Sequence, residues 1–272
     1  DMPGHMKAAL AAYPELGCTG GPYEVGHAWG IYKDVLCLGN EQVFRFVNAI
    51  IDEVADIFPA KYIHIGGDET PTTRWGECPK CQKVAAEQNL KLNKLQAYFT
   101  NRVEKYINGK GRKIIGWDEI LEGDVAPGST VMSWRGIDGG MEAVKRGLDA
   151  IMSPNTYYYL DYYQTKAHRM TLIGGDLPVE KVYSYNPVPD DASDALKQHV
   201  KGVQVNLWTE YVMGRDLALY QLLPRLAAMA ETGWTENAKK DLASFKQREG
   251  KLNQLYHHYD WKACQEMFKE KK

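Results

Sequence analysis

The chain has 272 residues, and its 33 Lys and Arg against 35 Asp and Glu give a formal net charge of −2. So small a charge creates no strong field for holding a polyanion or an anionic membrane, which disfavours a dedicated nucleic-acid binder. Hydrophobic residues make up 44% of the chain and charged residues 25%, a globular composition, and no apolar run approaches the roughly 18–20 residues of a membrane-spanning helix.

A helix followed by a short strand is the first regular unit that the sequence predicts. After a Gly-rich opening segment, apolar residues from Val43 to Ile57 recur at three- and four-residue steps, which indicates an amphipathic helix with Asn40 as its N-cap. Pro59 ends this helix, and residues 62–65 then read as a short strand that leads into a glycine pair.

The same alternation continues along the chain. Helical patterns over residues 79–107, 141–146 and 216–231 are interleaved with short strands over 113–117, 130–133, 149–152 and 200–206. The residues after Glu210 read as helical and offer no further strand. Short buried strands that alternate with helices are typical of a parallel sheet or barrel.

The fold class that this pattern predicts is α/β, as a TIM-type (β/α)8 barrel. Only five strands are found in the sequence, whereas a closed barrel has eight. We therefore expect residues 1–272 to form one partial barrel domain, from roughly the end of strand 3 through strand 8 and the C-terminal helices, with the N-terminal portion absent from this chain. Because unpaired strand edges invite association, we expect that portion, a second chain or a homodimer to cover them.

Polar and aromatic side chains follow each predicted strand. The C-terminal ends of the strands of such a barrel form one rim, where its active site lies. Seven Trp and 17 Tyr against six Phe also give a surplus of rings that can stack on a sugar and hydrogen-bond at the edge. We expect one pocket to be lined by residues 64–69, 117–119, 133–135, 157–161 and 206–210.

The segment from His64 to Glu69 is the strongest indication of a catalytic site in the sequence. Adjacent side chains of a regular strand point to opposite faces, so Asp68 and Glu69 could not both address one ligand from a strand. Gly66 and Gly67 allow the backbone to leave the strand geometry and to bring both carboxyls to the rim. Two neighbouring carboxyls push their pKa values apart, which suits the division of labour in glycoside hydrolysis.

Six segments together resemble the catalytic domain of family 20 glycoside hydrolases, the β-N-acetylhexosaminidases. In family order they are Asp1-Met-Pro-Gly-His5, His64-Ile-Gly-Gly-Asp68-Glu69, Gly116-Trp117-Asp-Glu119, Ser133-Trp134-Arg-Gly136, Tyr159-Leu-Asp161 and Gly202-Val-Gln-Val-Asn-Leu-Trp208-Thr-Glu210. The resemblance implies an exo-acting enzyme, with no cofactor or catalytic metal, that removes terminal GlcNAc or GalNAc from glycans or chitooligosaccharides. On this basis residues 1–272 are expected to be part of a catalytic domain.

The mechanism that the resemblance implies is substrate-assisted retaining hydrolysis, in which the 2-acetamido oxygen of the substrate attacks the anomeric carbon. By the matched motifs, Glu69 would protonate the leaving oxygen and later activate water. Asp68 would accept a hydrogen bond from the acetamide N–H and stabilise the developing positive charge. Tyr159 would donate a hydrogen bond to the acetamide oxygen and hold it in line for attack.

The other matched positions are expected to bind the sugar. Trp117, Trp134 and Trp208 would wall the acetamide group and the sugar ring, because an apolar C–H face stacks well on indole. Asp161 and Glu210 would hold sugar hydroxyls through charge-assisted hydrogen bonds.

Several acidic and basic residues near these positions are expected to support the site. His5 would lie behind Glu69 as a partner of that carboxyl, and His64 reads as a hydrogen-bonded residue of its strand. Asp118 and Glu119 repeat the acidic pair without the preceding glycines and are read as structural. The substrate-binding Arg of the family lies on the first strand, which is expected to precede Asp1.

Two alternative functions remain open at the level of the sequence. A metal-dependent hydrolase could use His5, His64, Asp68 and Glu69 as ligands, although no HExxH motif is present. A non-catalytic module that binds N-acetyl sugars is the other alternative.

The five cysteines are too few for a disulfide scaffold of this size. Cys18 and Cys37 flank a Gly-rich loop and could form a disulfide across it. Cys78-Pro-Lys-Cys81 resembles a redox or half-zinc motif, but no second CxxC or CxxH follows, so a loop disulfide or free thiols is favoured over a four-ligand zinc site.

The first residues lack the profile of a signal peptide, so the N-terminus does not give the compartment. A secreted or periplasmic location is expected from the resemblance alone, because the family mostly meets its glycans outside the cytoplasm.

Overall fold

The computed structural model describes residues 1–166 and 171–269 and divides into two compact units. The first unit comprises Asp1–Met132 and Lys145–Asp149, and the second comprises Ser133–Val144 and the described residues from Ala150 onward. Strand β3, helix α6 and strand β4 each cross a boundary between these segments.

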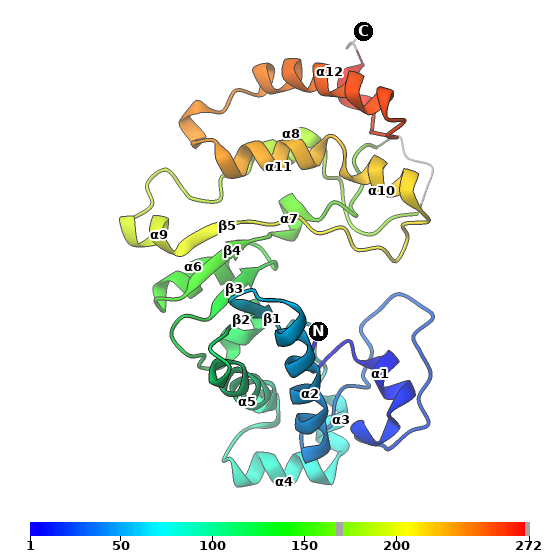
Figure 1. Ribbon diagram of the computed structural model, residues 1–272, viewed down its shortest axis with the longest axis vertical. Coiled ribbons are helices and arrows are strands. Elements are labelled where there is room, and N and C mark those ends of the chain that lie inside the picture. The colour runs from blue at the N-terminus through cyan, green and yellow to red at the C-terminus, as the bar shows by residue number, and fades with distance from the viewer. Residues whose placement is uncertain (167–170, 270–272) are drawn as a thin grey trace. The chain divides into compact units, whose positions relative to one another are not determined.

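The first unit begins with two short helices and a long loop, after which helices and parallel strands alternate (Figure 1). Its elements are α1 (Lys7–Ala12), η1 (Pro14–Leu16), α2 (Glu41–Ile57), β1 (Tyr62–His64), α3 (Thr73–Glu77), α4 (Pro79–Glu87), η2 (Leu92–Lys94), α5 (Leu95–Gly109), β2 (Lys113–Trp117), η3 (Asp118–Glu122) and β3 (Thr130–Ser133).

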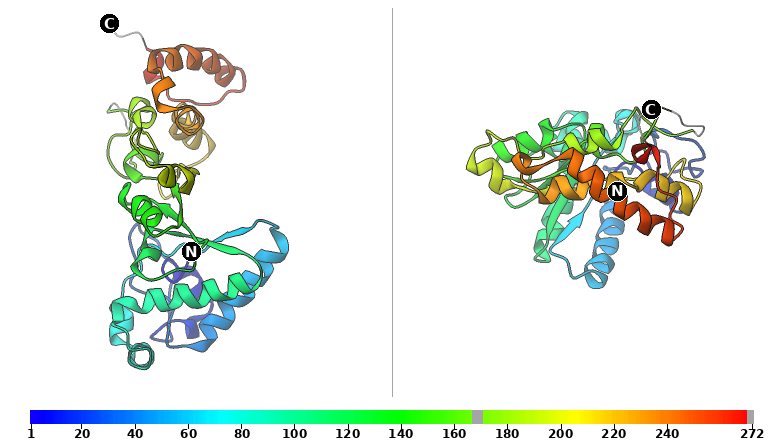
Figure 2. Two further views of the ribbon diagram at one scale, coloured as in Figure 1. Left: turned by 90° about the vertical axis from the view of Figure 1, so that its left-hand side faces the viewer. Right: turned by 90° about the horizontal axis from the view of Figure 1, so that it is seen from above.

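Helix α2 begins where its sequence pattern predicts. The Asn40 side chain accepts a hydrogen bond of 3.0 Å from the Gln42 backbone N–H, which satisfies one of the free donors at the helix start. Phe44 of α2 lies buried against Phe99 of α5, with ring centroids 5.8 Å apart. The guanidinium of Arg102 lies 3.5 Å from the centroid of the Phe44 ring. Helices α2 and α5 therefore pack together, as Figures 1 and 2 show.

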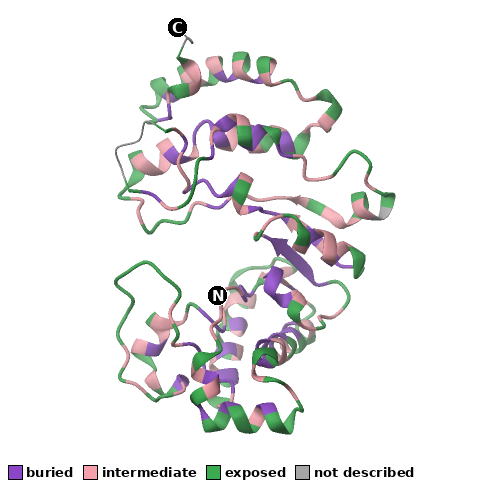
Figure 3. Cartoon of the chain, turned by 180° about the vertical axis from the view of Figure 1, so that it is seen from behind, coloured by how far each residue is buried: buried purple, intermediate pink, exposed green. Residues whose placement is uncertain are grey.

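Strands β1, β2 and β3 pair in parallel. Tyr62 lies opposite Lys113, and Ile115 lies opposite Thr130, so each strand advances in the same direction as its neighbour. All four residues of β3 are buried, and Figure 3 draws this strand in purple. Because the strands are parallel, their C-terminal ends lie at one edge of this sheet, and the segments that follow them start there.

The N-terminal segment lies along the end of β1. The Met2 N–H donates to the Ile65 carbonyl over 3.1 Å, and the Leu36 N–H donates to the Pro3 carbonyl over 3.1 Å. These backbone bonds hold residues 1–5 beside the glycine pair that follows the strand.

The second unit repeats the alternation of helices and strands. Its elements are α6 (Asp138–Lys145), β4 (Asp149–Met152), α7 (Asn155–Tyr158), α8 (Val179–Ser184), α9 (Asp194–His199), β5 (Val200–Val203), α10 (Arg215–Leu222), α11 (Arg225–Trp234), η4 (Asn237–Lys239), α12 (Leu242–His258) and η5 (Glu266–Phe268). Strands β4 and β5 are parallel, with Met152 opposite Val203 and an irregular register between Ala150 and Ile151. Helices α8 and α11 pack against one another.

Two of the predicted helices are each divided in the structure. The pattern over residues 79–107 becomes α4 and α5, because Asn89 takes φ +52° and the Leu90 N–H donates to the Ala85 carbonyl over 2.8 Å, which closes α4 with a left-handed turn. The pattern over residues 216–231 becomes α10 and α11, which meet at Pro224, a residue with no N–H to continue a helix. The predicted strand 200–206 is shorter, ending at Val203.

Among residues 1–166 and 171–269, no helix is both long enough and apolar enough to cross a membrane.

The turn after β1 is the part of the fold most sensitive to a single methyl group. Gly66 has φ +78°, and a Cβ there would lie 1.7 Å from Oδ1 of Asp1. We expect Gly66→Ala to lower the free energy of unfolding through the left-handed backbone, by about 1–2 kcal/mol, and through the steric overlap, by a further 1–3 kcal/mol or so.

Gly111→Ala is the matched control, because Gly111 has φ +72° and no atom within 4 Å of its Cβ position. Denaturant unfolding of the two variants separates the terms. Equal losses of stability in both variants would contradict the close approach of Asp1 to the turn.

Candidate functional site

In the first unit, the two adjacent carboxylates share one histidine. After β1 the backbone passes through Gly66 and Gly67 with φ +78° and +96°, and Glu69 itself takes φ +47°. His5 Nε2 lies 3.4 Å from Asp68 Oδ2 and 3.5 Å from Glu69 Oε2. The left-handed turn therefore brings both carboxyls to the same imidazole, which a regular strand could not do.

The two carboxylates beside His5 affect its protonation. The hydrogen bond with Asp68 raises the pKa of His5 above its usual value, and the charges of Asp68 and Glu69 act in the same direction. The His5 ring is therefore protonated over a wider pH range than a free histidine. Asp68 Oδ1 is nevertheless buried and has no hydrogen-bond partner among the described residues, so it can accept a hydrogen bond from a ligand.

Hydrogen bonds from several directions fix the glycine turn. The Gly67 N–H donates to Asp1 Oδ1 over 3.1 Å, the Trp117 N–H donates to the Gly66 carbonyl over 2.9 Å, and Gln96 Nε2 donates to the Gly67 carbonyl. Asp1 and Gln96 were not identified as site residues from the sequence. Asp1 lies within a matched motif, whereas a single buried Gln on α5 carries no pattern that points to the turn.

His64 and Trp117 stand next to this turn. His64 Nδ1 accepts a hydrogen bond of 3.0 Å from the Gly66 N–H, as the reading of a hydrogen-bonded strand residue predicted. Its ring meets the buried Trp117 edge-on, with centroids 5.0 Å apart. Asp118 and Glu119 follow Trp117 and are buried in η3, 4% and 8% exposed.

Among the described residues near the glycine turn, Asp1, His5 and Asp68 could hold a cation. One ligand atom from each lies within 4.8 Å of the others. This set differs from the four ligands considered from the sequence, since it includes Asp1 and lacks His64 and Glu69. It has one nitrogen and two carboxylate ligands.

In the second unit, the matched aromatic residues surround Tyr159. Its ring is stacked on Trp134, with centroids 6.1 Å apart and planes 11° apart, and it meets Trp208 at 66°. Tyr159 is 8% exposed, whereas Trp208 is 40% exposed. The backbone beneath is fixed by a parallel bridge between Tyr159 and Asn206. Trp134, Tyr159 and Trp208 thus form one aromatic cluster.

Asp161 lies two residues beyond Tyr159 and is 4% exposed. Burial raises the pKa of its carboxyl to about 6, and the charge of Glu210 contributes in the same direction. Asp161 Oδ1 is a second buried oxygen with no partner among the described residues. Glu210 is exposed and close enough to influence Asp161 electrostatically.

A buried arginine holds the backbone that carries Asp161. Arg225, with 0% exposure, donates to the carbonyls of Leu160, Tyr162 and Leu177. Gln221 Nε2 donates to the Asp161 carbonyl over 3.0 Å. Neither residue was identified from the sequence, because a single Arg or Gln within a helix carries no pattern that points to these carbonyls.

The structure therefore brings the predicted residues together as two sets, one in each unit. The first contains His5, His64, Asp68, Glu69 and Trp117, and the second contains Trp134, Tyr159, Asp161, Trp208 and Glu210.

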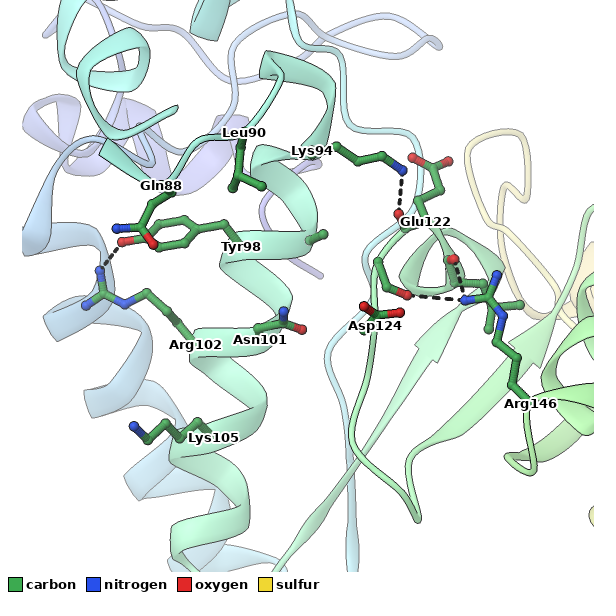
Figure 4. A pocket seen from close by; sticks show the side chains of 13 residues that line it. Gln88, Leu90, Lys94, Tyr98, Asn101, Arg102, Lys105, Glu122, Asp124 and Arg146 are labelled. Atoms are coloured by element: carbon green, nitrogen blue, oxygen red, sulfur yellow. Dashed lines mark hydrogen bonds between the residues drawn. The ribbon is translucent and has the colours of Figure 1, made fainter. Parts of the chain in front are cut away.

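A hollow of about 850 Å³ on the first unit contains none of these residues. It lies between α5 and the segment after η3, where Lys94 Nζ donates to the Glu122 carbonyl and Arg146 donates to the Leu121 carbonyl (Figure 4). Six of the 13 residues that line it are charged, and we assign it no role.

Parallel strands that alternate with helices, with carboxylates and aromatic rings after the strands, define the class of protein: an α/β domain of the (β/α)8 type. The chain belongs to glycosyl hydrolase family 20, because the model of the catalytic domain of that family matches residues 1–237. The fold class and the family expected from the sequence are thereby confirmed.

Curated relatives agree with this assignment. A β-hexosaminidase of Porphyromonas gingivalis is 48% identical over 251 residues, which cover 91% of this chain and 32% of the relative. A β-hexosaminidase of Vibrio furnissii is 33% identical over 86% of this chain and 39% of its own length. The chain thus spans roughly a third of the length of these relatives.

Solved structures of the family share the fold. The exo-β-N-acetylglucosaminidase of Vibrio harveyi, in complex with N-acetylglucosamine, matches 97% of this chain and 42% of its own with a TM-score of 0.85 and 28% identity. The chitobiase of Flavobacterium johnsoniae matches 91% of this chain and 37% of its own with a TM-score of 0.80 and 31% identity.

The raised pKa of Asp161 predicts a pH dependence of stability. A carboxyl whose pKa is about 6 in the folded state binds a proton more tightly than in the unfolded state, where its pKa is near 3.8. Its contribution to the free energy of unfolding therefore falls as pH rises from about 4 to 6, by roughly 2–3 kcal/mol, and is constant above that range.

Asp161→Asn should remove this fall, and the exposed Asp191→Asn should not. Denaturant titrations of both variants and the parent protein at about pH 4.5 and 7.5 measure the difference. Parallel stability curves for the parent and Asp161→Asn would contradict the buried, high-pKa carboxyl.

Proposed function

We propose that this protein is an exo-β-N-acetylhexosaminidase that removes terminal GlcNAc or GalNAc by substrate-assisted retaining hydrolysis. The observation that carries the proposal is the shared contact of His5 with Asp68 and Glu69 after the glycine turn. Membership of glycosyl hydrolase family 20 and relatives named β-hexosaminidase support it.

Asp68 and Glu69 divide the work at the acetamido group and the glycosidic bond. The buried Asp68 Oδ1 has no protein partner and suits an acceptor for the acetamide N–H. In that position its charge stabilises the oxazolinium-like intermediate that forms when the acetamide oxygen attacks the anomeric carbon. Glu69 donates its proton to the leaving oxygen and then removes one from the attacking water.

His5 acts on both carboxylates. Because its pKa is raised, the ring carries a positive charge over a wider pH range than a free histidine. We assign His5 as a positioning residue, since it touches the two carboxylates and not the reacting atoms.

The set in the second unit binds the sugar. The hydroxyl of Tyr159 donates a hydrogen bond to the acetamide oxygen. Trp134 and Trp208 pack against the acetamide methyl group and the apolar face of the sugar ring. The unpartnered Asp161 Oδ1 and the exposed Glu210 accept hydrogen bonds from sugar hydroxyls. Trp117, next to His64, offers a further apolar surface to the sugar.

The natural substrates that this site suits are glycans or chitooligosaccharides that end in an N-acetylhexosamine. A secreted or periplasmic location fits such substrates. The expectation that residues 1–272 act as part of one catalytic barrel, completed by a further portion, a second chain or a homodimer, stays a prediction. It rests on the five parallel strands among the described residues, where a closed barrel has eight.

The role of Glu69 is tested by its dependence on the leaving group. Glu69→Gln should lower kcat/KM by roughly 10²–10⁴-fold on chitobiose, whose leaving oxygen needs a proton, and by less on a 4-nitrophenyl glycoside, whose leaving group does not. Glu53→Gln, on the exposed face of α2, is the control and should leave both values unchanged. Equal losses on the two substrates would contradict a general acid at Glu69.

The alternative of a sugar-binding module without catalysis gives a different result. The unmutated protein would then bind N-acetylglucosamine, measured by calorimetry, and would release no 4-nitrophenol from the aryl glycoside. The proposal predicts turnover, and it predicts that an aryl β-glucoside, which lacks the acetamido group, is cleaved at least roughly 10³-fold more slowly.

A further inference from the structure

Four cysteines from three separate segments of the first unit lie together. The Sγ–Sγ distance is 3.8 Å between Cys18 and Cys81, and 3.7 Å from Cys37 to each of Cys78 and Cys81. All four sulfur atoms lie within 4.8 Å of one another, and all four cysteines are free thiols. These distances are far longer than the 2.05 Å or so of a disulfide bond.

The spacing of the sulfurs is that of a tetrahedral thiolate site. Zinc–thiolate bonds are about 2.3 Å long, so the sulfurs at the corners of such a tetrahedron lie about 3.8 Å apart. Four soft thiolates in tetrahedral arrangement favour Zn²⁺ over harder cations such as Mg²⁺ or Ca²⁺. Because all four positions are supplied by the protein, the site would be structural, with no open position for a substrate.

The fold presents the four sulfurs through ordinary local structure. Cys78 is the N-cap of α4 and Cys81 lies in its first turn, so this Cys-x-x-Cys pair faces one point. Cys37 is fixed by its N–H, which donates to the Leu16 carbonyl over 2.8 Å. Gly39 follows Cys37 and packs so closely on the start of α4 that a Cβ there would lie 2.6 Å from the Cys81 nitrogen.

Burial of the cluster also favours a metal. Cys37, Cys78 and Cys81 are 1%, 4% and 0% exposed, while Cys18 is partly exposed and provides a route for the ion to enter. A buried cysteine that only fills space needs no neighbouring sulfur, and Cys264 shows that case: it is buried and belongs to no cluster of possible ligands among the described residues.

We propose that Cys18, Cys37, Cys78 and Cys81 bind one zinc ion as a closed structural site. The ion ties both ends of the exposed loop over residues 18–37, drawn mostly green in Figure 3, to the start of α4. One tied segment follows the N-terminal arm that carries His5, and the other follows Asp68 and Glu69. The zinc site thereby braces the two chain segments that meet at the carboxylate pair, and it is separate from the proposed hydrolysis.

Metal analysis of the purified protein is the direct test. Expressed with Zn²⁺ in the medium and dialysed against metal-free buffer, the protein should retain about one zinc per chain by mass spectrometry of its metals. Replacement of the zinc by Co²⁺ should give the visible absorption bands of tetrahedral thiolate-bound cobalt. The proposal would be overturned if the protein held less than about a tenth of an equivalent of zinc, or held iron in its place. It would also be overturned if the intact protein mass were lower by two hydrogens per disulfide, which would show that the cysteines are oxidised.

Single substitutions then locate the ligands. Cys37→Ser should lose the bound zinc and lower the thermal midpoint by more than roughly 5 °C, whereas Cys264→Ser should keep about one zinc per chain. Cys18→Ser, at the partly exposed ligand, is the second variant in case the first does not fold. Full zinc retention by a folded Cys18→Ser protein would overturn the four-cysteine site.

Discussion

The left-handed turn after β1 is the constraint on which the site depends. A strand alternates its side chains between two faces, so consecutive carboxylates can address one ligand only if the backbone leaves the strand. Gly66 and Gly67 make that departure possible, and Glu69 completes it with φ +47°, an unfavourable value for a residue with a Cβ. The strain is tolerated because the turn is held by Asp1, Gln96 and the backbone of β2.

Two buried carboxylate oxygens, Asp68 Oδ1 and Asp161 Oδ1, have no hydrogen-bond partner among the described residues. A buried oxygen without a hydrogen bond lowers the stability of the fold, so both atoms are suited to accept a hydrogen bond from a ligand. Asp68 lies in the turn that follows β1, and Asp161 lies in the segment that follows β4 and α7. Ligand hydroxyls and an acetamide N–H are donors that such oxygens suit.

The regular elements could be predicted from the sequence because they depend on local pattern. The helix that begins after Asn40 and the strands at 113–117, 130–133 and 149–152 appear where periodicity places them. The predicted helix over 216–231 is divided at Pro224, because proline has no N–H with which to continue a helix. The acidic pair and the aromatic residues were found because motif order marks them.

Contacts between distant segments could not be predicted in the same way. Gln96 reaches the glycine turn, and Arg225 reaches three carbonyls, through packing that no short pattern encodes. The cysteines show the limit most clearly. A search for a second Cys-x-x-Cys beside Cys78 and Cys81 misses Cys18 and Cys37, because these come from the two ends of one loop and meet the pair only in the folded chain.

The central claim is that the acetamido oxygen of the substrate is the nucleophile and that Asp68 steers it. The most direct measurement is kcat/KM for a series of 4-nitrophenyl glycosides whose N-acetyl group carries one, two or three fluorine atoms. Fluorine weakens the nucleophilicity of the amide oxygen, so the account predicts a steep fall of kcat/KM along the series. Values that stay level across the three fluorinated substrates would show that the amide oxygen does not attack and would contradict the account.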